Sequence, residues 1–289
     1  MVYLILSIVC VSSLVLLFKA FERSGVNVFQ AIVVNYCVAA ILGFSLSKHA
    51  SSLHVSLGAS WLPYSILLGC LFISIFNLIG ISTQKLGVSA TSVANKMSMI
   101  IPVAAAIVLY DDTLGILKIC GIVLALAAVY LASVGKMNSE KGKNRFSFLL
   151  LPVIFAGSGI LDALINYSQK KFSLDSETDL FVSSAFATAA VIGILILIGG
   201  IALKKIQFRM KSLAGGIALG IPNYFSMYFL MLALEGSDMQ SSVVFPVNNL
   251  GVVALSAGLS VLLFGEKLSR ANVAGILLSI LSIALIALS

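Results

Sequence analysis

Apolar and polar positions form long blocks along the chain. Predominantly apolar stretches of about 20 residues are separated by short polar connections, and about 20 apolar residues in a helix cross the roughly 30 Å hydrocarbon core of a bilayer. The stretches are 2–19, 27–47, 60–83, 88–110, 114–134, 147–169, 179–202, 213–234, 239–264 and 270–288. The pattern predicts an all-α membrane protein with ten transmembrane helices.

Composition excludes a soluble protein of this size. Of 289 residues, 60% are hydrophobic and 10% are charged, against about 25% charged in ordinary soluble domains. The connections are too short for a soluble catalytic or nucleotide-binding domain, and the continuous apolar runs lack the period of two of a membrane barrel. The net charge of +7 lies in loops beside the predicted helices, so we expect no nucleic-acid partner.

The few cysteines and histidines predict neither a metal site nor a cofactor. The four cysteines fall inside predicted helices and form no Cys-x-x-Cys pair. His49 and His54 share one loop and form no zinc motif. The sequence implies no cofactor, but it leaves open that the protein couples its activity to protons.

Lysine and arginine concentrate in alternate connections. The connections after the odd-numbered predicted helices hold 13 of these residues, and those after the even-numbered helices hold 4. The positive-inside rule therefore places the odd connections in the cytoplasm and both termini outside.

An internal duplication divides the chain. An Asn, an acidic residue and a Gly recur at a constant offset of 154 residues. These landmarks, separated by 17 and then 9 residues in each half, are Asn95, Asp112 and Gly121, followed by Asn249, Glu266 and Gly275. Each half holds five predicted helices, an odd number, so the second copy enters the membrane from the opposite side. We expect inverted five-helix repeats at 1–137 and 146–289, an architecture typical of secondary transporters.

The two acidic turns carry a family resemblance. Tyr110–Leu114 and Phe264–Leu268 each close a predicted helix ahead of a Gly-bearing terminal helix. With them, the chain resembles a ten-helix, EamA-type member of the drug/metabolite transporter superfamily, although Asp-Asp replaces the usual Gly-Glu in the first turn. The resemblance implies a plasma-membrane (bacterial inner-membrane) carrier, commonly an exporter of amino acids or other metabolites. It also implies cytoplasmic termini, opposite to the charge count.

Two charged side chains lie well inside predicted helices, where insertion costs about 2.5–3.5 kcal/mol. Lys96 is nine residues into its helix, and Asp162 shares a helix face with Ser158, Asn166 and Gln169. That polar face predicts either the wall of an aqueous cavity or a hydrogen-bonded seam. Lys96 could bind a substrate anion or pair with Asp162, and the two roles are compatible.

Polar residues also follow two prolines in other helices. Asn223 and Tyr224 follow Pro222, and a pair of asparagines follows Pro246. Proline interrupts helix hydrogen bonding, and interrupted helices in corresponding positions point to transporter binding sites. Pro102 and Pro246 interrupt corresponding helices, although not in register. The candidate substrate-binding residues are Lys96, Asn95, Asp162, Asn223, Tyr224, Asn248 and Asn249.

These features predict a secondary-active transporter that moves a small polar, amino-acid-like metabolite by alternating access. The family resemblance implies that it is an exporter. Asp162 is also the candidate proton carrier. The alternatives are a channel or a lipid-handling protein. An intramembrane enzyme is less favoured because no catalytic set is complete. Expected partners are the substrate and membrane lipid, and a homodimer is compatible with the sequence.

Three local features predict packing. Gly216 and Gly220 have the four-residue spacing that allows close helix approach. Trp61 and Tyr64 are expected to anchor a helix at the membrane interface. The nearly all-apolar fifth and tenth predicted helices are expected at the periphery or at a partner interface.

Overall fold

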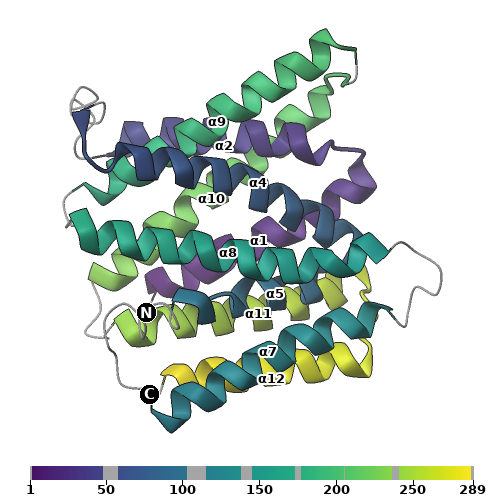
Figure 1. The fold of residues 1–289 in the computed structure, drawn as a ribbon. Helices are drawn as coiled ribbons and strands as arrows, with labels where there is room; N and C mark the ends of the chain where they lie inside the picture. The colour runs from purple at the N-terminus through teal and green to yellow at the C-terminus, as the bar shows by residue number, and fades with distance from the viewer. Residues whose placement is uncertain are drawn as a thin grey trace. The chain divides into compact units, whose positions relative to one another are not determined.

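A computed structural model describes residues 2–47, 58–102, 115–137, 145–172, 177–204, 206–235 and 241–287, and these residues form helices and loops without strands. The helices are α1 (Val2–Ser24), α2 (Val28–Leu46), α4 (Leu62–Leu86), α5 (Val88–Met97), α7 (Ile116–Met137), α8 (Arg145–Phe172), α9 (Thr178–Ala202), α10 (Met210–Glu235), α11 (Ser241–Phe264) and α12 (Arg270–Ala287). Figure 1 labels them and colours them from the N-terminus to the C-terminus.

Each apolar stretch of the sequence overlaps one of these helices within the described residues, and α5 covers only the first part of the stretch 88–110. Six helical segments are both long and apolar enough to cross a membrane: Val2–Ser24, Val28–Leu46, Leu62–Leu86, Asp179–Ala202, Met210–Leu230 and Val247–Phe264. These segments indicate a membrane protein. A total of ten crossings stays a prediction.

The fourth predicted helix is interrupted, whereas its counterpart is continuous. Helix α5 ends at Met97, and Ser98 and Met99 form a turn ahead of helical residues 100–102, which include Pro102. The second proline, at position 246, does not break α11. It lies in the second turn of that helix, which stays continuous although the Ser242 carbonyl has no N–H four residues later to accept. The expected pair of breaks is therefore present in the first copy only, within the part of the chain that the structure describes.

Two compact units make up the chain. Unit 1 contains Met1–Lys19, Leu78–Ile160 and Phe225–Ser289, and unit 2 contains Ala20–Asn77 and Leu161–Tyr224. Helices α1, α4, α8 and α10 each have residues in both units. The units are not the predicted repeats, since each combines segments from both halves of the sequence. The repeat boundaries at 1–137 and 146–289 stay a prediction.

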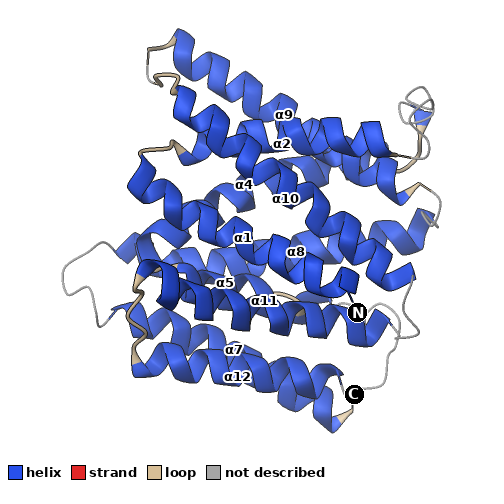
Figure 2. Ribbon diagram, turned by 180° about the vertical axis from the view of Figure 1, so that it is seen from behind, coloured by secondary structure: helices blue, strands red, loops and turns tan. Residues whose placement is uncertain are grey.

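In unit 1, helices from the two halves of the sequence pack in pairs. Helix α7 lies beside α12 and α5 beside α11, and α11 also contacts α12 (Figure 1, Figure 2). The Ser282 hydroxyl donates to the Gly121 carbonyl at 2.7 Å and joins α12 to α7. The first half of α1 packs its buried Leu4 against Ala233 and Val244. The two nearly all-apolar helices are thus packed against each other.

In unit 2, α2 packs along α9 and against the first part of α10. A Cβ added at Gly216 would meet the side chain of Val34, and one at Gly220 would lie 2.9 Å from the Asn35 carbonyl oxygen. The two helices therefore approach as closely as the glycine spacing predicts, and that prediction is confirmed. Tyr36, fully buried on α2, donates its hydroxyl to the Phe72 carbonyl at 2.9 Å.

The aromatic pair at the start of α4 divides between two environments. Trp61 is only 3% exposed and donates its indole N–H to Glu177 at 2.6 Å, so its expected place as an interfacial anchor is wrong. The ring is drawn inward because Phe181 packs edge-on against it. Tyr64 accepts a hydrogen bond from the Lys171 ammonium at 2.7 Å, which raises the pKa of Lys171. That partly exposed pair fits the predicted interfacial position.

Candidate functional site

Helices α5 and α11 meet along a seam of small polar side chains in unit 1. Residue numbers rise along α5 as they fall along α11, so the helices cross antiparallel. The contacts join Ser89 to Ser260 at 3.1 Å, Ser92 to Ser256 at 2.9 Å and Met99 to Asn249 at 3.3 Å. Short hydroxyl side chains at this seam let the helices approach closely and hydrogen-bond to each other.

Four of the seven candidate residues lie on the two helices that form this seam. Asn95 and Lys96 are half-buried on α5, Asn249 is half-buried on α11, and Asn248 is 3% exposed. The side-chain oxygen of Asn248 has no hydrogen-bond partner among the described residues. Buried polar atoms are nearly always hydrogen-bonded, so this oxygen is a natural acceptor for a polar ligand or water.

The end of α5 lies directly beside Lys96. The Ser98 hydroxyl donates to the Asn95 carbonyl at 2.5 Å, and the Ile101 N–H bonds back to the Ser98 carbonyl at 2.9 Å. The chain therefore turns just after the cation. Interrupted membrane helices are tolerated where they are buried in protein or line a cavity, and they are common at transporter binding sites.

Glu266 tethers the other end of α5. Its carboxylate accepts the Val88 N–H at 3.2 Å, at a helix start where Gly87 supplies no side-chain cap. A negative charge is favourable at a helix N-terminus. The sequence marked Glu266 only as a repeat landmark, because its partner is 178 residues away. Asp112, its counterpart in the duplication, lies with the turn Tyr110–Leu114 outside the described residues.

The remaining three candidate residues are in unit 2. Asp162 on α8 and Asn223 and Tyr224 on α10 are all half-buried. The seven residues thus form one group of four and one group of three, each described within its own unit. The polar face of Asp162 was predicted to continue through Asn166 and Gln169. The structure does not describe the side chains of these two residues.

Asn35 and Ser158 are two of the buried polar residues that were not among the seven candidates. Asn35 on α2 is fully buried, and neither its side-chain oxygen nor its nitrogen has a partner among the described residues. Ser158, one helical turn before Asp162, is 6% exposed with an unpartnered hydroxyl. The sequence signal was visible, since both are polar residues inside apolar stretches. Deciding which such residue finds a partner requires the packing of neighbouring helices.

Nothing in the described part of the chain gathers three or more His, Cys, Asp or Glu side chains into a metal-binding group. The described cysteines Cys10, Cys37, Cys70 and Cys120 are free thiols. His49 and His54 lie outside the described residues.

Comparisons with known proteins support the fold and leave the function open. No family model matches the chain. A protein of Haemophilus influenzae, described as an uncharacterized protein, is 28% identical over 284 residues, which cover 97% of this chain and 95% of the relative. A protein of known crystal structure aligns with a TM-score of 0.61 and 16% identity, over 98% of this chain and 94% of its own. That likeness shows a shared fold.

Proposed function

We propose that the protein is a secondary-active carrier that exports a small polar, amino-acid-like metabolite across the plasma (bacterial inner) membrane by alternating access. The observation that carries the proposal is the α5–α11 seam. There, a half-buried ammonium group lies beside an interrupted membrane helix, and a buried amide oxygen on the partner helix lacks a partner.

The helix pairs support an inverted repeat. The second, fourth and fifth helices of one predicted half pack against the second, fourth and fifth of the other, as α2 with α9, α5 with α11 and α7 with α12. The α5–α11 pair crosses antiparallel. A two-fold axis in the membrane plane would exchange such partners, as in carriers built from inverted repeats.

The chemistry of the seam suits a zwitterion. Lys96 supplies a cation for a carboxylate, and the Asn248 side-chain oxygen can accept a hydrogen bond from an ammonium group. Asn95 and Asn249 add amide groups that can donate or accept. We assign substrate binding to these four residues. For Asp162, Asn223 and Tyr224, substrate binding stays a prediction from the sequence.

Counterflow in proteoliposomes tests the proposal. Vesicles that contain the full chain are loaded with a mixture of unlabelled amino acids, and uptake of the same mixture in labelled form is measured. We expect saturable uptake that the internal amino acids accelerate. Flux that neither saturates nor responds to internal amino acids would indicate a channel. No flux with any amino acid would remove the amino-acid assignment.

Lys96→Met tests the cation while keeping a long, flexible side chain. A hydrogen bond to a charged group contributes about 1.5–3 kcal/mol, so we expect uptake at low concentration to fall roughly ten-fold or more. Lys85→Met, at an exposed position near the end of α4, is the matched control and should leave uptake unchanged. Equal uptake by both variants would contradict the role assigned to Lys96.

A further inference from the structure

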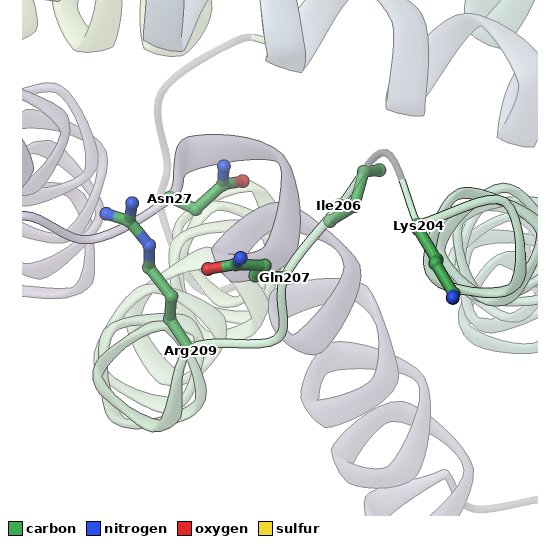
Figure 3. Close-up of a pocket in the computed structure, with 5 residues that line it drawn as sticks. All are labelled: Asn27, Lys204, Ile206, Gln207 and Arg209. Carbon is green, nitrogen blue, oxygen red and sulfur yellow. The ribbon is translucent and has the colours of Figure 1, made fainter.

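A polar pocket of about 320 Å³ lies within unit 2, at the start of α2 and the connection between α9 and α10. Figure 3 shows its lining, with the Lys204 and Arg209 side chains on opposite sides of Gln207. The lining residues are Asn27, Lys204, Ile206, Gln207 and Arg209. None of the described residues that line the pocket is acidic and two are basic, so its character is cationic.

A buried glutamine holds the pocket together. Gln30, 1% exposed, donates its side-chain amide to the Gln207 carbonyl at 2.7 Å and accepts the Arg209 N–H at 3.0 Å. Its own backbone N–H bonds to the Asn27 side chain at 3.0 Å. The α9–α10 connection is therefore fastened to the first turn of α2 beside the pocket.

Both cations are positioned by the backbone. The Arg209 guanidinium donates to the Gly25 carbonyl at 3.1 Å, which fixes the side chain beside the pocket. Lys204 has a φ of +55°, a left-handed conformation at the end of α9 that normally favours glycine. A lysine at a strained position suggests that its side chain serves a function there.

Large apolar side chains adjoin the pocket along the same connection. Leu203 is 68% exposed, Phe208 49% and Met210 71%. Exposed apolar side chains at the end of a membrane helix are suited to contact with acyl chains. Two cations, Lys204 and Arg209, thus lie in the same connection as exposed apolar side chains, a combination that complements the anionic headgroup and the acyl chains of a phospholipid. Basic pockets between membrane helices are known to hold lipid headgroups.

We propose that this pocket binds the phosphate headgroup of an anionic phospholipid, with Lys204 and Arg209 as its cations and Leu203, Phe208 and Met210 against the acyl chains. This role is independent of the carrier proposal, because none of the pocket residues belongs to the α5–α11 seam. The pocket would be the binding site of the membrane lipid that the sequence analysis expects as a partner.

Binding of phosphatidylglycerol to the purified full-length protein tests the proposal, with native mass spectrometry to measure retained lipid and phosphatidylcholine as the neutral comparison. Each basic residue near an anionic headgroup contributes about 1 kcal/mol. We therefore expect Lys204→Gln and Arg209→Gln each to weaken phosphatidylglycerol binding about five-fold and to leave phosphatidylcholine unaffected. Raised salt should weaken binding to the unaltered protein in the same direction.

Two control variants distinguish an effect of the pocket from an effect of the protein's overall charge and from a loss of stability. Lys267→Gln removes an exposed cation from another connection after an odd-numbered predicted helix and should leave phosphatidylglycerol binding unchanged. Lys204→Gly removes the cation and the backbone strain together, so it should weaken binding like Lys204→Gln without lowering the melting temperature. Unchanged binding in both pocket variants, or equal weakening by Lys267→Gln, would overturn the proposal. Equally tight binding of soluble glycerol phosphate would overturn the lipid assignment.

Discussion

The contact between α10 and α2 provides the sharpest test of the helix packing. Gly216 and Gly220 lie against α2 with no room for a larger residue. A Cβ at Gly216 would lie 2.7 Å from the Ala31 carbonyl oxygen, and one at Gly220 would lie 2.7 Å from the Cβ of Val38. Backbone and Cβ atoms cannot rotate away, so Gly216→Ala or Gly220→Ala must push the helices apart.

The size of the effect follows from two opposing contributions. Overpacking a tight contact costs about 1–3 kcal/mol, whereas replacing glycine by alanine inside a helix stabilises it by about 0.8–1 kcal/mol. We expect each variant to lose a net 0–2 kcal/mol of stability, and the double variant to lose more. Gly258→Ala is the matched control, because a Cβ there meets nothing within 4 Å. That control should be neutral or slightly stabilising.

Thermal unfolding of the purified protein in detergent measures the difference. We expect the melting temperatures of Gly216→Ala and Gly220→Ala to fall below that of Gly258→Ala. If all three variants melted at the same temperature, the close approach of α10 to α2 would be wrong.

Three further substitutions test one hydrogen bond in each unit and the proposed role of Asp162 as a proton carrier. Glu266→Gln removes the charge at the start of α5 while keeping an acceptor for the Val88 N–H, and we expect thermal unfolding to show a loss of about 0.3–1 kcal/mol. Trp61→Phe keeps an aromatic ring but leaves Glu177 without its indole donor, so a loss of about 1.5–3 kcal/mol is expected in the same assay. Asp162→Asn should abolish the pH dependence of proteoliposome uptake if Asp162 carries the coupled proton, and an unchanged pH profile would remove that role.

Helix boundaries could be predicted from the sequence because they depend on local composition. The apolar stretch 179–202 became α9, which begins one residue earlier and ends at the same position. Proline was a weaker guide, because the break after Met97 lies close to Pro102, whereas Pro152 and Pro222 lie inside continuous helices. The close approach at Gly216 was also readable, because four-residue spacing fixes which glycines share a helix face.

The candidate site could be predicted only in part. Lys96 and Asn248 were identifiable as polar residues inside apolar helices, yet only the structure showed that these two helices pack antiparallel against each other. Trp61 was misassigned because amphipathic character does not distinguish the interface from a buried position with an acidic partner. Glu177 supplied that partner from 116 residues away.

The sequence by itself determined which segments are helical and apolar, because hydropathy, proline and glycine act within a few residues. Only the tertiary structure decided which helices meet, that Glu266 caps α5, and that Lys204 and Arg209 share a pocket held by Gln30. Those contacts join residues far apart in the chain. They depend on side-chain shape and on hydrogen bonds formed when helices pack, which no local pattern of residues specifies.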